Sequence, residues 1–130
     1  MKRRILIIDG DAVAQLIYKK SINLMGNKLY EVVEAGNARE ATNYFIRNQV
    51  DLVITEIKLP DVDGVEMFDI IKEFNPDMKV IIASVYPLDK QQQLFPLASG
   101  YYNKTEGMDQ LMERISCTVV HQNTFEPIYN

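Results

Sequence analysis

Five polar side chains lie at or just after the ends of apolar runs, in positions where chemistry is possible. Each apolar run has the length and composition of a buried strand, and a turn signal follows it. The side chains concerned are those of Asp9, Asp11, Glu56, Ser84 and Lys104. Carboxylates can hold Mg²⁺ or attack a phosphoryl group to form an acyl phosphate, and hydroxyl and ammonium groups can bind phosphoryl oxygens. This set of residues therefore indicates the handling of a phosphoryl group.

Five runs are predicted as strands, and a helical pattern follows each of them. The strands are expected at 5–8, 30–33, 51–56, 79–84 and 100–103. Alternation of strands and helices predicts an α/β, doubly wound fold with a parallel sheet. With right-handed crossovers, the common strand order is 2-1-3-4-5, in the flavodoxin-like arrangement, with the first and third strands adjacent. That order places Asp9 and Glu56 side by side in one crevice, with Ser84 beside them.

Helices are predicted from apolar residues at helical spacing and from capping residues. Asp11 caps the first helix, which stops at Gly26, and Asn37 with Glu40 forms a capping box for the second. The apolar or small residues that mark four helices are Val13, Leu16, Ile17 and Leu24; Ala38, Ala41, Thr42 and Phe45; Met67, Phe68, Ile71 and Phe74; and Met108, Leu111, Met112, Ile115 and Val119. The helix within 87–99 is expected to be short, kinked or mobile, because Pro96 removes a backbone donor and three consecutive glutamines carry no periodic signal.

The length and composition favour one domain at 1–120, followed by a patternless tail at 121–130. A net charge of -4 argues against a nucleic-acid-binding surface, which needs clustered Lys and Arg. The apolar run at 5–8 is too short for a signal peptide or a membrane span, so we expect a cytoplasmic protein without membrane association. The single cysteine, Cys117, is expected to be a small residue on a helix rather than a nucleophile.

The chain resembles the receiver domain of two-component response regulators, the CheY-like fold, over residues 3 to about 120. The 5–11 segment resembles the first strand with its acidic pair, and 51–64 resembles the strand, phosphorylation site and loop. Ser84 corresponds to the switch hydroxyl, Tyr101 to the switch aromatic residue and Lys104 to the lysine that contacts phosphate. The resemblance implies a non-enzymatic module of phosphorelay signal transduction, with Mg²⁺ as the family's cofactor.

Four residues depart from the family pattern. Glu56 stands at the phosphorylated aspartate, Gly10 at an acidic metal ligand, Val85 at a position that is usually a small Ala, and Thr105 at a proline. A glutamate is longer by one methylene, and misplacement of about 1 Å can cost about a hundredfold in an oriented displacement. With one acidic ligand missing, Mg²⁺ is expected to be weakly bound or absent. Asp11 is a possible replacement ligand, although its role as a helix cap is favoured.

Two roles for Glu56 remain open. In the first, Glu56 imitates an acyl phosphate by engaging Ser84 or Lys104 permanently, which biases the domain toward its active-like arrangement. In the second, Lys58, where the family binds metal through a backbone carbonyl, turns inward and replaces the metal beside Asp9 and Glu56. A solvated loop lysine is the favoured interpretation of Lys58.

We therefore predict an atypical receiver that acts as a protein-interaction module. Its expected partners are a histidine kinase or a downstream effector, which contact the face formed by the fourth strand, the fifth strand and the last helix. One alternative is a functional phospho-acceptor that uses Glu56 with Mg²⁺. Another is a small phosphatase or flavin-binding protein on the same topology, which is disfavoured because the segment after the first strand is acidic where an anion would bind.

Overall fold

The five predicted strands form one parallel sheet in the order β2-β1-β3-β4-β5. The structure is a computed structural model that describes residues 2–26 and 28–128, with side chains described as far as residue 119. The strands are β1 (Arg3–Ile8), β2 (Tyr30–Ala35), β3 (Leu52–Thr55), β4 (Val80–Ser84) and β5 (Gly100–Asn103). Ile8 at the end of β1 pairs with Thr55 at the end of β3. The predicted strand order and the adjacency of Asp9 and Glu56 are therefore confirmed.

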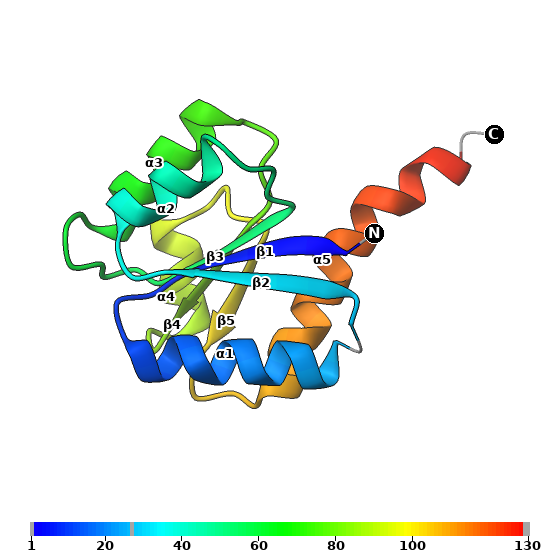
Figure 1. Cartoon of the computed structure of the whole chain (residues 1–130), viewed down its shortest axis with the longest axis horizontal. Coiled ribbons are helices and arrows are strands. Elements are labelled where there is room, and N and C mark those ends of the chain that lie inside the picture. The colour runs from blue at the N-terminus through cyan, green and yellow to red at the C-terminus, as the bar shows by residue number, and fades with distance from the viewer. Residues whose placement is uncertain (1, 27, 129–130) are drawn as a thin grey trace.

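Helices cover both faces of this sheet, as the alternating pattern predicts. They are α1 (Ala12–Met25), α2 (Ala38–Phe45), α3 (Gly64–Phe74), α4 (Leu88–Leu94) and α5 (Met108–Ile128). In Figure 1, α2 and α3 lie above the sheet and α1 lies below it. One buried cluster joins α2 and α3 to the sheet, and the other joins α1 and α5 to the opposite face. Among the described residues, no helix has the length and apolar character needed to span a membrane.

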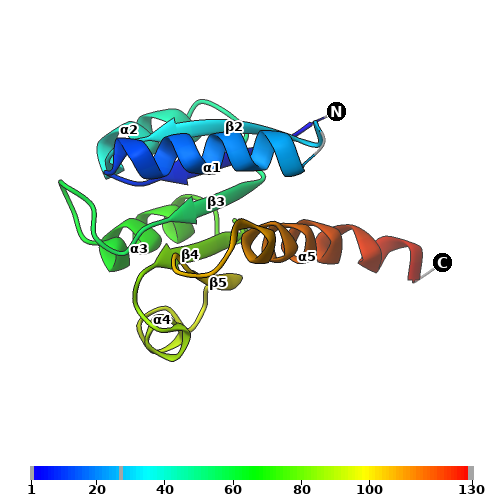
Figure 2. The same cartoon turned by 90° about the horizontal axis from the view of Figure 1, so that it is seen from below.

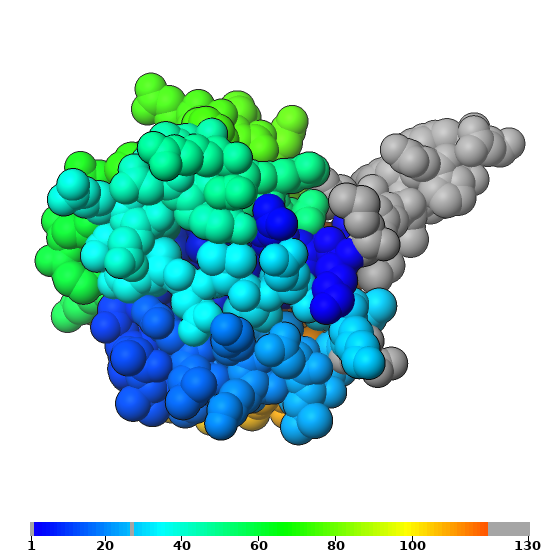
Figure 3. All heavy atoms as spheres, in the orientation of Figure 1, coloured from blue at the N-terminus to red at the C-terminus, as the bar shows by residue number. Residues whose placement is uncertain are grey.

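The buried face of α1 differs from the residues that mark this helix in the sequence. Val13, Leu16, Ile17 and Leu24 are between 48% and 84% exposed, whereas Tyr18 and Ile22 are buried against the sheet. Figure 3 shows the α1 segment, in blue, at the surface of the molecule. The helix itself is confirmed, but the choice of its inner side is wrong because α1 carries apolar residues on more than one side.

The remaining helices follow their predicted faces more closely. Ala38, Ala41 and Phe45 of α2 are buried, as are Leu111 and Ile115 of α5. Three of the four α3 residues that were expected to be buried are buried, whereas Phe74 is 51% exposed and packs its ring against Phe45 with centroids 5.2 Å apart. The apolar stripe of α3 therefore extends beyond the part of the helix that the rest of the protein covers.

The last two helices, α4 and α5, differ greatly in length. The short α4 ends before Pro96, as a missing backbone donor requires. By contrast, α5 continues to Ile128, so the helix extends into the 121–130 segment that was expected to have no regular pattern. In Figures 1 and 2 its last turns project beyond the sheet.

The start of α3 fixes the loop that follows β3. Asp63 caps the helix by accepting a hydrogen bond from the backbone N–H of Glu66. Gly64 donates its N–H to the carbonyl oxygen of Ile57 at 2.6 Å, and a Cβ at this position would lie 2.5 Å from the same oxygen. Glycine is therefore required here by the close approach of two backbone segments.

Candidate functional site

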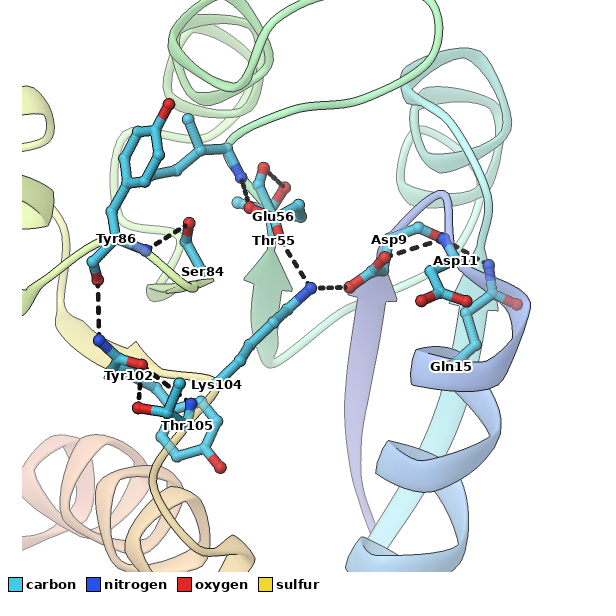
Figure 4. Close-up of polar contacts among 12 residues, drawn as sticks. Asp9, Asp11, Gln15, Thr55, Glu56, Ser84, Tyr86, Tyr102, Lys104 and Thr105 are labelled. Atoms are coloured by element: carbon cyan, nitrogen blue, oxygen red, sulfur yellow. Dashed lines mark hydrogen bonds and ion pairs between the residues drawn. The ribbon is translucent and has the colours of Figure 1, made fainter.

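An ion-paired group of three residues lies in a cleft at the carboxyl ends of β1, β3 and β5. The ammonium nitrogen of Lys104 is 2.6 Å from Oδ2 of Asp9 and 2.6 Å from Oε1 of Glu56. Figure 4 shows the lysine side chain reaching between the two acids. The surrounding cleft has a volume of about 460 Å³. Thus one cation bridges the two acids that the strand order brings together.

The second oxygen of each acid is also engaged. Oε2 of Glu56 accepts a hydrogen bond from the backbone N–H of Ile57 at 2.5 Å, and Oδ1 of Asp9 accepts one from the N–H of Asp11 at 2.9 Å. The side-chain amide of Gln15 donates to the Asp9 carbonyl at 2.6 Å. These bonds fix both carboxylates relative to the backbone, so that each acid presents only one oxygen to Lys104.

The environment of Lys104 keeps its side chain charged. Burial alone lowers its pKa, but hydrogen bonds and charge attraction from Asp9 and Glu56 outweigh burial, and the net effect is a raised pKa. Tyr18, below the cleft on α1, has its pKa raised by burial and, to a smaller extent, by the negative charges of the same two acids. The cleft therefore holds an ammonium group between its two acids.

Gly10 and Asp11, which lie shortly after β1, determine how many acids point into the cleft. Asp11 is exposed and accepts a hydrogen bond from the N–H of Val13 at 2.9 Å, which confirms its predicted role as the cap of α1. Gly10 adds no ligand, and a Cβ at this position would lie 3.0 Å from Cγ of Pro60. The acidic pair of the family is thus reduced to Asp9 and a capping residue.

Lys58 lies at the rim of the cleft rather than between the acids. Its side chain is exposed, and its backbone forms an isolated bridge with Asp63. Among the described residues, the cation that pairs with Asp9 and Glu56 is Lys104. The alternative in which Lys58 turns inward therefore has no support in this arrangement, and a solvated loop lysine fits it.

Ser84 and Tyr101 occupy their predicted strands but do not meet Glu56. The buried hydroxyl of Ser84 accepts a hydrogen bond from the N–H of Tyr86 at 3.2 Å, and no hydrogen bond to Glu56 occurs among the described side chains. The Tyr101 hydroxyl donates to the carbonyl oxygen of Phe95 at 2.5 Å. Of the predicted partners of Glu56, only Lys104 is engaged.

The other two departures from the family pattern lie beside the cleft. Thr105 donates its backbone N–H, which a proline lacks, to Oδ1 of Asn103 at 2.9 Å. Its hydroxyl donates to the same oxygen at 2.7 Å. Val85 is 63% exposed and lines the cleft opening. Val85 thus forms part of the rim, whereas Thr105, directly after Lys104, is held to Asn103.

Asp61 supports the loop beside the cleft through contacts that the sequence does not predict. Its carboxylate accepts hydrogen bonds from the backbone N–H groups of Ala38 at 2.9 Å and Arg39 at 3.0 Å. These bonds, with the one from Ala38 contributing most, lower the pKa of Asp61. Asp61 thereby fastens the loop after β3 to the start of α2. The sequence shows only a turn-forming residue here, since a contact across more than twenty residues leaves no local signal.

The donor set is poor for a divalent metal ion. Within the described part of the chain, no group of three or more Asp, Glu, His or Cys side chains converges as metal ligands do. Mg²⁺ prefers octahedral oxygen coordination and tolerates little distortion. Two carboxylates that already bind an ammonium group, next to a glycine, do not fit that requirement.

Comparisons with known proteins agree with the fold. The family model described as the response regulator receiver domain matches residues 5–116. Sporulation initiation phosphotransferase F from Bacillus subtilis is 26% identical over 117 residues, which cover 88% of this chain and 92% of that protein. Chemotaxis protein CheY from Thermotoga maritima is 33% identical over 85 residues, or 65% of this chain and 68% of that protein.

Solved structures give the same result. The response regulator TrrA from Thermotoga maritima, in complex with Mg²⁺ and BeF, superposes with a TM-score of 0.80 at 28% identity, covering 89% of this chain and 98% of that chain. A CheY-like receiver domain protein from Methanospirillum hungatei JF-1 gives a TM-score of 0.85 at 27% identity, covering 95% of this chain and 98% of that chain.

Proposed function

Because this chain belongs to the response regulator receiver domain family, we propose that it is an atypical receiver that serves two-component signalling as a protein-interaction module. In this proposal Glu56 is a permanent partner of Lys104 and is not used as a phosphate acceptor. The observation that carries the proposal is the ammonium group of Lys104, 2.6 Å from both acids of the cleft. The proposal accounts for a complete receiver fold whose site residues depart from the family.

Chemistry at Glu56 supports this proposal. A carboxylate that attacks a phosphoryl group needs a free oxygen aligned with the phosphorus atom. Both oxygens of Glu56 are engaged, one by Lys104 and the other by the N–H of Ile57. Attack would therefore require breaking at least one of these bonds.

The same ion pairs argue against a resident Mg²⁺. Lys104 places one positive charge between two negative ones, so a divalent ion would have to compete with its ammonium group for Asp9 and Glu56. Removal of an acidic ligand at Gly10 weakens metal binding further. We propose that this receiver keeps its arrangement without metal.

The role of Glu56 as a mimic of an acyl phosphate is supported in part. Glu56 engages Lys104, which is one of the two contacts expected of a mimic, while the Ser84 hydroxyl is bonded to the N–H of Tyr86. A mimic acting through both residues would need Ser84 to turn toward Glu56. We therefore propose that Glu56 fixes the lysine and leaves the hydroxyl unaffected.

We further propose that the partner is a histidine kinase or a downstream effector that docks on the face formed by β4, β5 and α5. Exposed apolar side chains in the segment that joins β4 to β5, which contains α4, support the choice, since exposed apolar surface is often used for protein contacts. They are Val85, Leu88, Leu94 and Leu97.

Phosphorylation of the intact protein tests the central claim. The protein is incubated with acetyl phosphate and millimolar Mg²⁺ and its mass is then measured, with the double variant Gly10→Asp/Glu56→Asp treated in parallel. We expect no phosphoryl adduct on the natural chain. An adduct in high yield that disappears in Glu56→Gln would refute the proposal and establish Glu56 as a phospho-acceptor. Beryllofluoride with Mg²⁺ provides a second probe, for which we expect no change in the NMR spectrum.

A further inference from the structure

The one fully buried residue of α4, among the residues described, is a glutamine. Gln91 is 0% exposed, whereas its neighbour Gln92 is exposed. Its side-chain nitrogen lies 2.8 Å from the carbonyl oxygen of Tyr86, 3.0 Å from that of Tyr102 and 3.3 Å from that of Ser84. A single amide group thus contacts the end of β4, the connection to α4, and β5.

The three carbonyl groups determine the orientation of this amide. A side-chain NH₂ carries two donor hydrogens and the amide oxygen carries none, so the nitrogen must face the three acceptors. The oxygen Oε1 then points away and is buried without a hydrogen-bond partner among the described residues. A buried acceptor without a donor is unfavourable. Gln91 therefore keeps this position because the contacts of its nitrogen outweigh that penalty.

Few other interactions hold α4 in place. The helix has seven residues, and its first capping position, Pro87, provides no side-chain hydrogen bond. A helix this short is marginal without tertiary contacts. Phe95, directly after α4, is buried against Phe68, and it supplies the apolar anchor at that end. In Figure 2, α4 lies at the edge of the molecule beside β4 and β5.

The carbonyl groups that Gln91 binds are also tied to the end of β5. The Ser84 carbonyl accepts from the backbone N–H of Lys104 at 2.8 Å, and the Tyr86 carbonyl accepts from the side-chain amide of Asn103 at 3.1 Å. The connection at 84–87 is thus held between α4 and β5 by backbone and amide groups. No charged group of the cleft takes part in these bonds.

We infer that Gln91 is the positioning residue that holds α4 and the 84–87 connection against β5. It occupies the buried position of α4 that an apolar side chain would usually fill. Within α4 itself the buried side chain is polar, so the helix can separate from the sheet with little exposure of apolar surface as long as Phe95, directly after it, stays anchored. This gives the proposed partner face one adjustable element on an otherwise apolar core. The inference concerns how α4 is held and does not depend on whether Glu56 accepts phosphate.

Hydrogen exchange on the full chain tests this role. Gln91→Met keeps the length and helix propensity of the side chain but deletes its donors, and Gln92→Met is the matched control at an exposed position. We expect the amides of 86–95 to exchange about tenfold faster in Gln91→Met, as the loss of well-paired hydrogen bonds implies. Amides of β1 and β3 are expected to keep their protection, as are all amides in the control.

Three outcomes would overturn the inference. Equal exchange in Gln91→Met and Gln92→Met would show that the amide contacts do not hold α4. A uniform increase over all strands would show that Gln91 supports only the stability of the whole domain. In Glu56→Ala, protection of α4 should be unchanged, and its loss there would make α4 dependent on the cleft instead. These results are independent of the acetyl phosphate experiment, so that the failure of one proposal can be told from that of the other.

Discussion

Replacing Lys104 by methionine should destabilise the protein more than any other single loss of charge in the cleft. The substitution keeps the length of the side chain but leaves the carboxylates of Asp9 and Glu56, which are 4% and 15% exposed, without their shared cation. Breaking a fully buried ion pair by removing one partner costs about 3–5 kcal/mol. Lys104 is itself 21% exposed, so solvent compensates in part, and we expect a loss of about 2–3 kcal/mol.

Urea unfolding monitored by circular dichroism measures this loss. For an m-value of about 1.5 kcal/mol per molar urea, the midpoint at pH 7 should fall by about 1.3–2 M. The matched control is Lys58→Met, which removes an exposed lysine at the rim of the same cleft. That control should change the stability by less than about 0.5 kcal/mol.

The pH dependence provides a second check on the same variant. The pKa of Lys104 is raised above 10.5 in the folded protein, so its stabilisation is fully present below that pH and is lost as the pH rises through the raised pKa. The difference in unfolding free energy between the natural protein and Lys104→Met should therefore be constant near neutrality and should become smaller above pH 10.5. Equal midpoints for Lys104→Met and Lys58→Met at pH 7 would refute the reasoning, because the ion pairs would then contribute nothing.

Three further predictions concern the scaffold around the cleft. Asp61→Asn should lower the urea midpoint at pH 7. Because the pKa of Asp61 is lowered from 3.8 in the folded protein, the difference in stability between the natural protein and the variant should shrink as the pH falls below that value. A difference that persists in acid would contradict this prediction. Gly64→Ala should cost about 2 kcal/mol or more in unfolding free energy, since its Cβ would meet the backbone of Ile57 at 2.5 Å, and a neutral result would mean that the loop relaxes freely. Ile22→Ala should cost about 2–4 kcal/mol, whereas Ile17→Ala should cost less than about 1 kcal/mol; the reverse order would restore the side of α1 that the sequence favours.

The fold could be predicted from the sequence because its strands are buried on both faces. Continuous runs such as 5–8 and 79–84 have no amphipathic alternative, and their spacing by helical segments leaves few topologies. The side of α1 could not be predicted in this way. Its apolar residues outnumber the positions that the sheet covers, so the choice of Tyr18 and Ile22 depends on tertiary packing.

The site was predictable in its members but not in its contacts. Strand order alone placed Asp9 next to Glu56, and the resemblance added Lys104. The choice of Lys104 over Lys58 as the bridging cation depends on side-chain reach, which a sequence does not encode. Gln91 carried no signal either, because a glutamine among three in a row is indistinguishable from its exposed neighbours until the fold buries it.

Contact between Gly10 and Pro60 limits how the cleft can change. A side chain at Gly10 would press on the proline ring at 3.0 Å, and the next residue, Asp61, fastens that loop to α2. A side chain added at Gly10 can therefore be accommodated only if the Pro60 ring gives way, in a loop that Asp61 holds to the start of α2. The mouth of the cleft is thus coupled mechanically to α2, so that a change beside Asp9 is transmitted to a helix on the other side of the β3–α3 loop.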